Sequence, residues 1–271
     1  MYIKSWYLPV FLLLSINVYS QQKEEFDFKY KVNYKMTYQT DSTDEGSVKQ
    51  RDMELLLNDS VSLFRSVEKG VYDSLAYEDN TYASRKLLRT PIKYQILKKG
   101  NSIITEDSYE YMAPKKLFYI ESKEDLKWDL QPDTVTISNF LCHSAKVRFG
   151  DRTWSVWYTL EIPIMDGPYK FCGLPGLILS AQDEKGYWRF DLDGIENRDR
   201  RIAINFIGEN NYRVLTKREF LKAKRYYVDN FVDILLARDL LILTEQQKRN
   251  QYKIQKIRGQ KDNNWIEPYK P

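Results

Sequence analysis

Residues 26–38 alternate between apolar and polar side chains, and this period of two constrains the fold more than any other feature of the sequence. Lys, Asp, Asn or Thr separates the apolar positions, which are Phe26, Phe28, Tyr30, Val32, Tyr34, Met36 and Tyr38. Successive side chains of a β-strand point to opposite faces, so such a segment buries one face and exposes the other. We therefore predict a half-buried strand of an antiparallel sheet.

Short segments of similar character follow along most of the chain. Aromatic residues, which favour strands, are abundant, with 21 Tyr, 12 Phe and 6 Trp. Turn residues separate these segments, which is typical of an antiparallel meander. We predict further strands at residues 53–58, 62–66, 92–98, 102–105, 116–120, 134–137, 144–149, 154–159, 177–183, 188–195 and 202–207.

The pattern changes to a helical one near the carboxyl end. Thr216 precedes Glu219 by three residues, a capping-box spacing that predicts the start of a helix over residues 217–238. After Thr244 the chain is mostly polar and basic, and we expect a shorter helix followed by a loose tail.

These elements predict a mainly β protein, a β-rich α+β fold in which a twisted antiparallel sheet or half-barrel carries a C-terminal helix. The arrangement resembles, as an architecture, the half-barrel of periplasmic lipoprotein-carrier proteins. No Pro/Gly/Ser-rich linker or repeat divides the sequence. We therefore assign residues 21–243 to one domain and residues 244–271 to a polar, basic tail.

The first 20 residues have the pattern of a secretory signal peptide. Lys4 precedes an apolar run over residues 6–16, and small residues precede Gln21, the expected start of the mature chain. A membrane-spanning helix is the alternative, but the run is shorter than the roughly 20 apolar residues that a span requires. We expect an exported protein, periplasmic or secreted, whose mature chain does not span a membrane.

A segment rich in glycine and proline precedes the predicted strand at residues 177–183. Its residues Gly173, Leu174, Pro175, Gly176, Leu177 and Ile178 spell GLPGLI. This motif resembles the signature of the GLPGLI family, a group of exported bacterial proteins found mainly in Bacteroidetes. The resemblance implies no catalytic residue, substrate or cofactor.

The spacing within this segment favours a structural turn. A phosphate-binding loop would need a lysine followed by Ser or Thr at P-loop spacing, which this segment lacks. We predict that Pro175 and Gly176 form a type II turn in which Gly176 supplies the positive φ. Leu177, Ile178 and Leu179 would then enter the core.

The two cysteines, Cys142 and Cys172, are predicted to form a disulfide, because an exported chain meets an oxidising environment. Two reduced, buried thiols are the alternative.

Aromatic and apolar residues around the turn are candidates for ligand binding. We expect Trp154, Trp157, Tyr158, Phe171 and Leu174 to line an apolar cavity, although side chains at strand spacing more often form a core. The leading hypothesis is a non-enzymatic protein that binds an apolar small molecule or lipid, or a protein partner in the cell envelope. The net charge of +4 does not indicate a nucleic-acid partner, because an exported protein meets no genome.

Two alternatives remain open, and the leading hypothesis assigns no catalytic residue, cofactor or metal. His143 is the only histidine, which excludes most triad and metal chemistry. A soft metal such as copper or zinc could still use reduced sulfur, with Cys142, His143, Met165 and Cys172 as ligands. A hydrolase could instead use acids near the predicted hairpin, chiefly Asp183 and Asp191.

Overall fold

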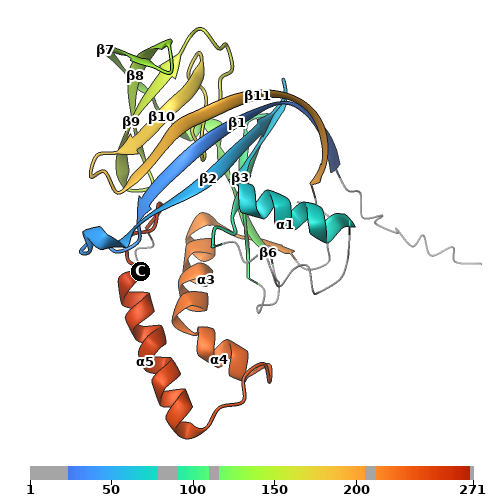
Figure 1. The fold of residues 1–271 in the computed structure, drawn as a ribbon, viewed down its shortest axis with the longest axis vertical. Helices are drawn as coiled ribbons and strands as arrows, with labels where there is room; N and C mark the ends of the chain where they lie inside the picture. The colour runs from blue at the N-terminus through green and yellow to red at the C-terminus, as the bar shows by residue number, and fades with distance from the viewer. Residues whose placement is uncertain (1–23, 79–90, 110–115, 205–211, 269–271) are drawn as a thin grey trace, which may run out of the picture.

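The computed structural model describes residues 24–78, 91–109, 116–204 and 212–268; the predicted signal peptide at residues 1–20 lies outside them. Within these ranges, twelve strands form one sheet in the order β12-β6-β5-β4-β3-β2-β1-β11-β10-β9-β8-β7. The order begins and ends with different strands, so the sheet is open. Figure 1 shows long, bent strands at its centre and helices α3 to α5 projecting beneath it. The predicted mainly β class is confirmed.

The strands are β1 (Glu24–Gln39), β2 (Val48–Leu57), β3 (Val61–Ser66), β4 (Gln95–Lys99), β5 (Ser102–Ser108), β6 (Lys116–Ser122), β7 (Asp129–Ile137), β8 (Phe140–Phe149), β9 (Arg152–Thr159), β10 (Leu177–Asp183), β11 (Trp188–Ile204) and β12 (Tyr212–Val214). The α-helices in the described ranges are α1 (Val67–Glu78), α3 (Lys217–Asp229), α4 (Phe231–Leu236) and α5 (Glu245–Lys261). The neighbouring strands of the described sheet are antiparallel except β12 and β6, which are parallel.

The alternating segment forms β1, near the centre of the sheet. Its partners are β2 on one side and β11 on the other, so this strand joins the two halves of the meander. The predicted alternation is confirmed, because the side chains from Val32 to Tyr38 are buried at every second position. Tyr34 packs its ring 6.5 Å from that of Phe64, and Phe64 in turn packs 5.9 Å from Phe190. The core is thus built of rings from the central strands.

Strand β11 departs from the prediction. Two strands were expected, at residues 188–195 and 202–207, but one strand of 17 residues runs from Trp188 to Ile204. Its charged middle lacks the apolar alternation of a strand, yet it pairs with β1 from Tyr38 opposite Trp188 to Glu24 opposite Ile204, with two shifts of register. Tertiary pairing therefore extends the strand where local sequence does not. Residues 205–207 lie outside the described ranges.

The predicted helix over residues 217–238 is two helices. Its capping box is confirmed, since the Thr216 hydroxyl accepts a hydrogen bond from the Glu219 amide and the Glu219 carboxylate accepts one from the Thr216 amide. The helix breaks at Asn230. Gln255 of α5 bonds to the chain on both sides of this break, donating to the Asp229 carbonyl and accepting from the Val232 amide at 2.6 Å.

The expected helix after Thr244 is confirmed as α5, but the loose tail expected beyond it is wrong for residues 264–267. Helix α5 has 17 residues and is longer than α3, which has 13. Beyond it, all four side chains from Asn264 to Glu267 are buried against the body of the protein. None of the helices in the described ranges has the length and apolar character needed to cross a membrane.

Gly176 is required for a reason other than the one predicted. It is not among the residues with positive φ, whereas Gly173 has φ 91°. A Cβ atom at Gly176 would lie 1.9 Å from the Thr159 carbonyl oxygen. The glycine therefore allows the backbone of the turn to approach the end of β9. The buried side chains from Leu177 to Leu179 confirm that the chain enters the core at this point.

We expect Gly176→Ala to lower the free energy of unfolding by about 3 kcal/mol or more, because the clash is with backbone that cannot rotate away. Denaturant unfolding of the purified protein measures this change. Gly194→Ala is the matched control, since a Cβ atom there meets nothing within 4 Å. Equal stabilities of the two variants would contradict this role of Gly176.

Candidate functional site

A buried lysine on β4 holds the loop that precedes β10. Lys98 forms an ion pair with Asp166 and donates hydrogen bonds to the carbonyls of Gly167 at 2.8 Å and Phe171 at 3.3 Å. Ser62 donates to the other oxygen of Asp166 at 2.6 Å. The Lys98 side chain is fully buried. A buried charge needs partners, and the loop supplies them, so its position is fixed from within.

The five residues predicted to line a ligand cavity are placed mainly in the core. Trp154, Phe171 and Leu174 are at most 2% exposed, Tyr158 is 6% exposed and Trp157 is half-buried. The rings of Trp154 and Phe171 lie 4.8 Å apart, in direct packing contact. Trp128 closes the same group, its ring 6.1 Å from that of Phe171, and donates to the Cys172 carbonyl at 2.9 Å. The structure therefore brings these side chains together as mutual packing partners.

The two cysteines are free in the structure, contrary to the predicted disulfide. Cys142 lies in β8 opposite Thr159 of β9, and its thiol donates to the Phe140 carbonyl at 3.5 Å. Cys172 lies in the loop before β10, where its backbone forms an isolated antiparallel β-bridge with Asp166. Their strand and loop environments hold the sulfurs apart. Burial raises the pKa of both thiols, which keeps them protonated and unreactive.

The soft-metal alternative finds no support in the parts of the chain that are described. They contain no group of three or more His, Cys, Asp or Glu side chains able to hold an ion. Met165 is 60% exposed, while both cysteines are buried. His143 is half-buried beside Tyr158, with 5.8 Å between the ring centroids.

The two acids proposed for a hydrolase have separate structural partners. Asp183 is buried, pairs with Arg152 at 2.7 Å and accepts from the Trp188 amide at 2.8 Å. Asp191 accepts from Ser180 at 3.0 Å and pairs with Arg189 at 2.6 Å. Neither arrangement has the form of an acid and a base facing a common cleft.

A second buried lysine, which sequence reasoning missed, lies at the centre of a polar cluster. Lys170 is fully buried and forms ion pairs with Glu267 and, at 2.5 Å, with Glu121. It also donates to the Tyr119 hydroxyl at 2.5 Å. Tyr169 donates to the Glu267 carboxylate, and Lys217 of α3 pairs with the same residue. The cluster thus joins the loop, β6, α3 and the carboxyl end of the chain.

Glu267 is held as a carboxylate in this cluster. Burial by itself would raise its pKa, but the ammonium groups of Lys170 and Lys217 reverse that effect and lower the pKa below its ordinary value of 4.5. Burial beside this carboxylate raises the pKa of Tyr169 and of Tyr119, so both phenols stay protonated and remain donors.

Residues 264–267, which we call the C-terminal segment, are bound chiefly by Arg152 at the start of β9. Its guanidinium donates to the Asn264 side-chain oxygen and to the Trp265 carbonyl, both at 2.7 Å, and to the Ile266 carbonyl at 3.1 Å. Asp183 fixes this guanidinium from the other side. The acid proposed for catalysis therefore positions the arginine that binds the carboxyl end.

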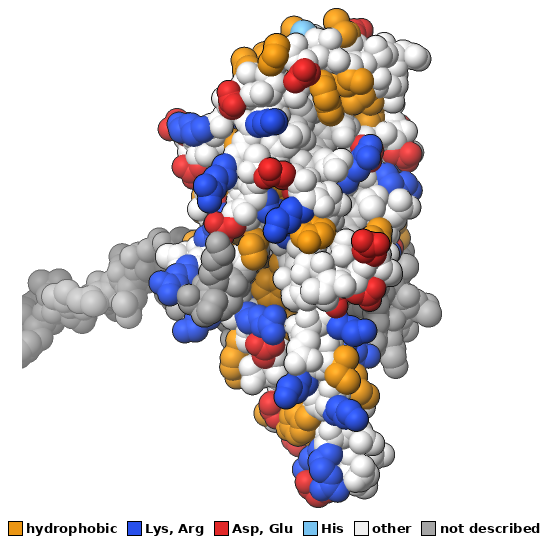
Figure 2. All heavy atoms as spheres, turned by 90° about the vertical axis from the view of Figure 1, so that its left-hand side faces the viewer, with side chains coloured by type: hydrophobic (Ala, Val, Ile, Leu, Met, Phe, Trp, Pro, Cys, Tyr) orange, Lys and Arg blue, Asp and Glu red, His pale blue; other side chains and the backbone are white. Residues whose placement is uncertain are grey.

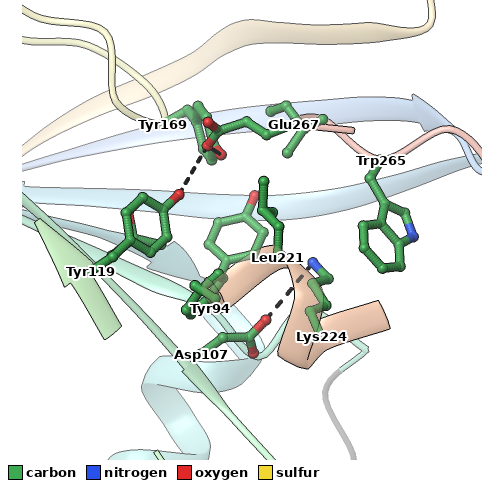
Figure 3. Close-up of a pocket in the computed structure, with 11 residues that line it drawn as sticks. Tyr94, Asp107, Tyr119, Tyr169, Leu221, Lys224, Trp265 and Glu267 are labelled. Atoms are coloured by element: carbon green, nitrogen blue, oxygen red, sulfur yellow. Dashed lines mark hydrogen bonds and ion pairs between the residues drawn. The ribbon is translucent and has the colours of Figure 1, made fainter. Parts of the chain in front are cut away.

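A small cavity of about 30 Å³ lies against the C-terminal segment. Tyr94, Tyr119 and Tyr169 line one part of it, and Leu221, Lys224 and Trp265 line another. Figure 3 shows the Tyr119–Glu267 contact on one side of this space and the Lys224–Asp107 pair, 3.8 Å apart, on the other. One water needs roughly 10–15 Å³, so the cavity has room for about two waters.

Leucines are exposed at the β7 edge of the sheet. Strand register places Leu130 of β7 opposite Ala145 of β8 and Cys142 of β8 opposite Thr159 of β9, so Leu141 and Leu160 each adjoin this last pair. Leu130 is 61% exposed, and Leu141 and Leu160 are each 51% exposed. We call these three residues the edge patch. Figure 2 shows hydrophobic side chains gathered at this end of the molecule.

One family model matches part of the sequence. Residues 146–180 match the family described as "Protein of unknown function (Porph_ging)". The matched segment runs from β8 to β10 and includes the glycine-rich loop with both Asp166 and Lys170. A comparison with curated proteins finds no match.

Solved structures of PNGF-II are similar in fold. The structure in space group P21 has a TM-score of 0.51 at 12% identity, and that in space group C2 has 0.50 at 13%. Each comparison covers 72% of this chain and 32% of the other, so the chain spans about a third of the PNGF-II chains. At this identity the likeness concerns the fold alone.

Both thiols should be titratable once the protein is unfolded without a reducing agent. In the native protein they should react slowly, because Cys142 and Cys172 are 0% and 2% exposed. Counting thiols with a coloured disulfide reagent, before and after denaturant, measures this. Absence of free thiols in the unfolded protein would instead indicate a disulfide.

Stability should depend on the charge of Glu267. Because its folded pKa is lowered, its contribution is complete above about pH 4.5 and is lost as the pH falls toward the folded value. The difference in unfolding free energy between wild type and Glu267→Gln should therefore shrink from pH 7 to pH 3. Exposed Glu184→Gln is the control and should match wild type throughout. A constant difference for Glu267→Gln would refute the ionised, paired state.

Proposed function

We propose that the protein is exported to the cell envelope, where it acts without catalysis by binding a protein partner along the β7 edge. Export rests on the signal-like pattern of residues 1–20. We also propose membership of the GLPGLI family, whose six-letter motif at residues 173–178 falls within the matched segment 146–180.

The edge patch is the observation that carries the proposal. Strand β7 ends the strand order of the described sheet, so its outer backbone groups face away from the other strands. Leu130 lies on β7 itself, Leu141 lies on the neighbouring strand β8, and Leu160 follows the end of β9; all three are exposed. A partner that adds a strand to β7 and packs further residues over β8 would cover Leu130 and Leu141, which is the chemistry of strand addition.

The cavity beside the C-terminal segment gives little room to the alternative of a bound apolar molecule. Pockets for small ligands usually enclose about 300–1,000 Å³. The cavity beside the C-terminal segment measures about 30 Å³. The aromatic residues predicted to line a ligand site belong to or pack against one core cluster, in which the rings of Trp154 and Phe171 are in contact. These two findings favour the partner over the small molecule.

Leu141→Lys should reduce partner capture at least tenfold when tagged protein is recovered from the envelope of the producing cells after cross-linking. The lysine ammonium group introduced into the edge patch would lose its hydration on partner binding without gaining a counter-ion. Ile195→Lys, at a 40% exposed position on β11, is the matched control and should retain the partner. The recovered chain should begin at Gln21.

Two results would overturn the proposal. One is equal recovery of every cross-linked protein by Leu141→Lys and the Ile195→Lys control. The other is a wild-type protein that is found in the envelope without any cross-linked partner.

A further inference from the structure

The carboxyl end of the chain lies on the body of the protein much as a bound peptide would. Four successive residues are each recognised: Asn264 through its side chain and carbonyl, Trp265 and Ile266 through their carbonyls, and Glu267 through its carboxylate. The Asn264 amide group donates to the Gln39 carbonyl at 2.7 Å, and the Trp188 indole donates to the Asn264 carbonyl at 3.0 Å. The body of the protein thus binds the side chains of Asn264 and Glu267 and the backbone carbonyls of Asn264, Trp265 and Ile266.

Side chains of the body of the protein make most of the hydrogen bonds to the C-terminal segment. The segment forms no strand of the described sheet. Asn264 and the preceding Asn263 each donate a backbone hydrogen bond to the Thr40 carbonyl, both at 3.2 Å. Arg152 and Lys170 supply the remaining main contacts from fixed positions in the body. The receptor groups would therefore present the same donors to any chain with the same four residues.

Packing beneath the segment is incomplete. The cavity of about 30 Å³ has Trp265, Ile266 and Glu267 in its wall. The core of a single domain is usually packed without a gap of this size. Interfaces between parts that can separate commonly hold water.

The helix that leads to the segment is weakly embedded. Gly259 is the one residue of α5 that is buried. Figure 1 shows α5 and α4 projecting from the body of the protein. Residues 237–244 join these helices, and within them Ile242 is 95% exposed. A change of direction in this connection would let α5 and the segment leave together.

We propose that the groove beneath residues 264–267 is a peptide-binding site, filled in cis by the chain's own C-terminal segment, which it also accepts from a second copy of the chain. The required chemistry is an Asn and, three residues later, a Glu, whose side chains Arg152 and Lys170 bind; Trp188 and Arg152 also bind backbone carbonyls of the segment. The occupant is a second copy because its segment carries these two residues at this spacing. The exchange is reciprocal, so it produces a closed, two-fold dimer.

A cleavable full chain tests the groove. A protease site introduced at Ile242 allows the connection to be cut while both pieces remain present. A fluorescent peptide of residues 262–268 should then bind at least 100-fold more tightly to the cut chain than to the uncut one. The reason is that a tethered segment competes at an effective concentration on the order of millimolar.

The peptide with Glu267→Gln should bind the cut chain at least tenfold more weakly, and a peptide with Pro268→Ala should bind as the unmodified one does. Failure of a folded, cut chain to take up peptide would overturn the proposal. Equal binding of the Glu267→Gln peptide would do so as well, and so would loss of the fold when the cut fragment is removed.

Two tagged versions of the uncut wild-type chain test the second copy as occupant. Mixed at high concentration and then diluted, they should yield dimers that carry both tags in native mass spectrometry. An excess of the 262–268 peptide during mixing should suppress these dimers. Exclusively monomeric chains, or mixed dimers that the peptide leaves unchanged, would refute exchange of the C-terminal segment.

Discussion

The contact between Lys170 and Glu267 is the interaction on which the position of the carboxyl end against the body of the protein depends. The two residues are 97 positions apart, and both are buried. Two buried charged groups are tolerated only when they form an ion pair with each other and when hydrogen bonds satisfy their remaining donors and acceptors. Tyr119, Tyr169 and Lys217 complete that arrangement. One buried cluster of ion pairs and hydrogen bonds therefore joins helix α3, strand β6 and the carboxyl end.

Two buried lysine–carboxylate ion pairs fix the loop before β10, one on each side. Lys98 reaches it from β4 and pairs with Asp166, while the loop's own Lys170 reaches out to Glu267. Gly176 then lets its backbone touch the end of β9. The loop before β10 therefore contacts β4, β9 and the C-terminal segment. The loop residues that make these contacts lie within the family match at residues 146–180. The glycines and prolines of the loop serve close approach within the protein.

Strand character was predictable where one face of a strand is buried and the other is not. This holds for β1, and β10 has the bounds predicted from its apolar run. The charged middle of β11 was missed because its pairing partner, β1, lies far away in the sequence. Lys170 and Glu267 carry no period or motif, so their meeting is a consequence of the fold. Residues 264–267 follow a polar helix, and this context predicted a tail instead of a buried segment.

A double-mutant cycle of Lys170→Met and Glu267→Gln, read out as the free energy of unfolding, tests this account most directly. Each single change leaves the other partner's charge or polar group poorly compensated and should cost about 3 kcal/mol or more. The double variant should recover much of that loss, with a coupling energy of about 1.5–3 kcal/mol. Losses that add to within about 0.5 kcal/mol would show that the two residues act independently, and would contradict the account.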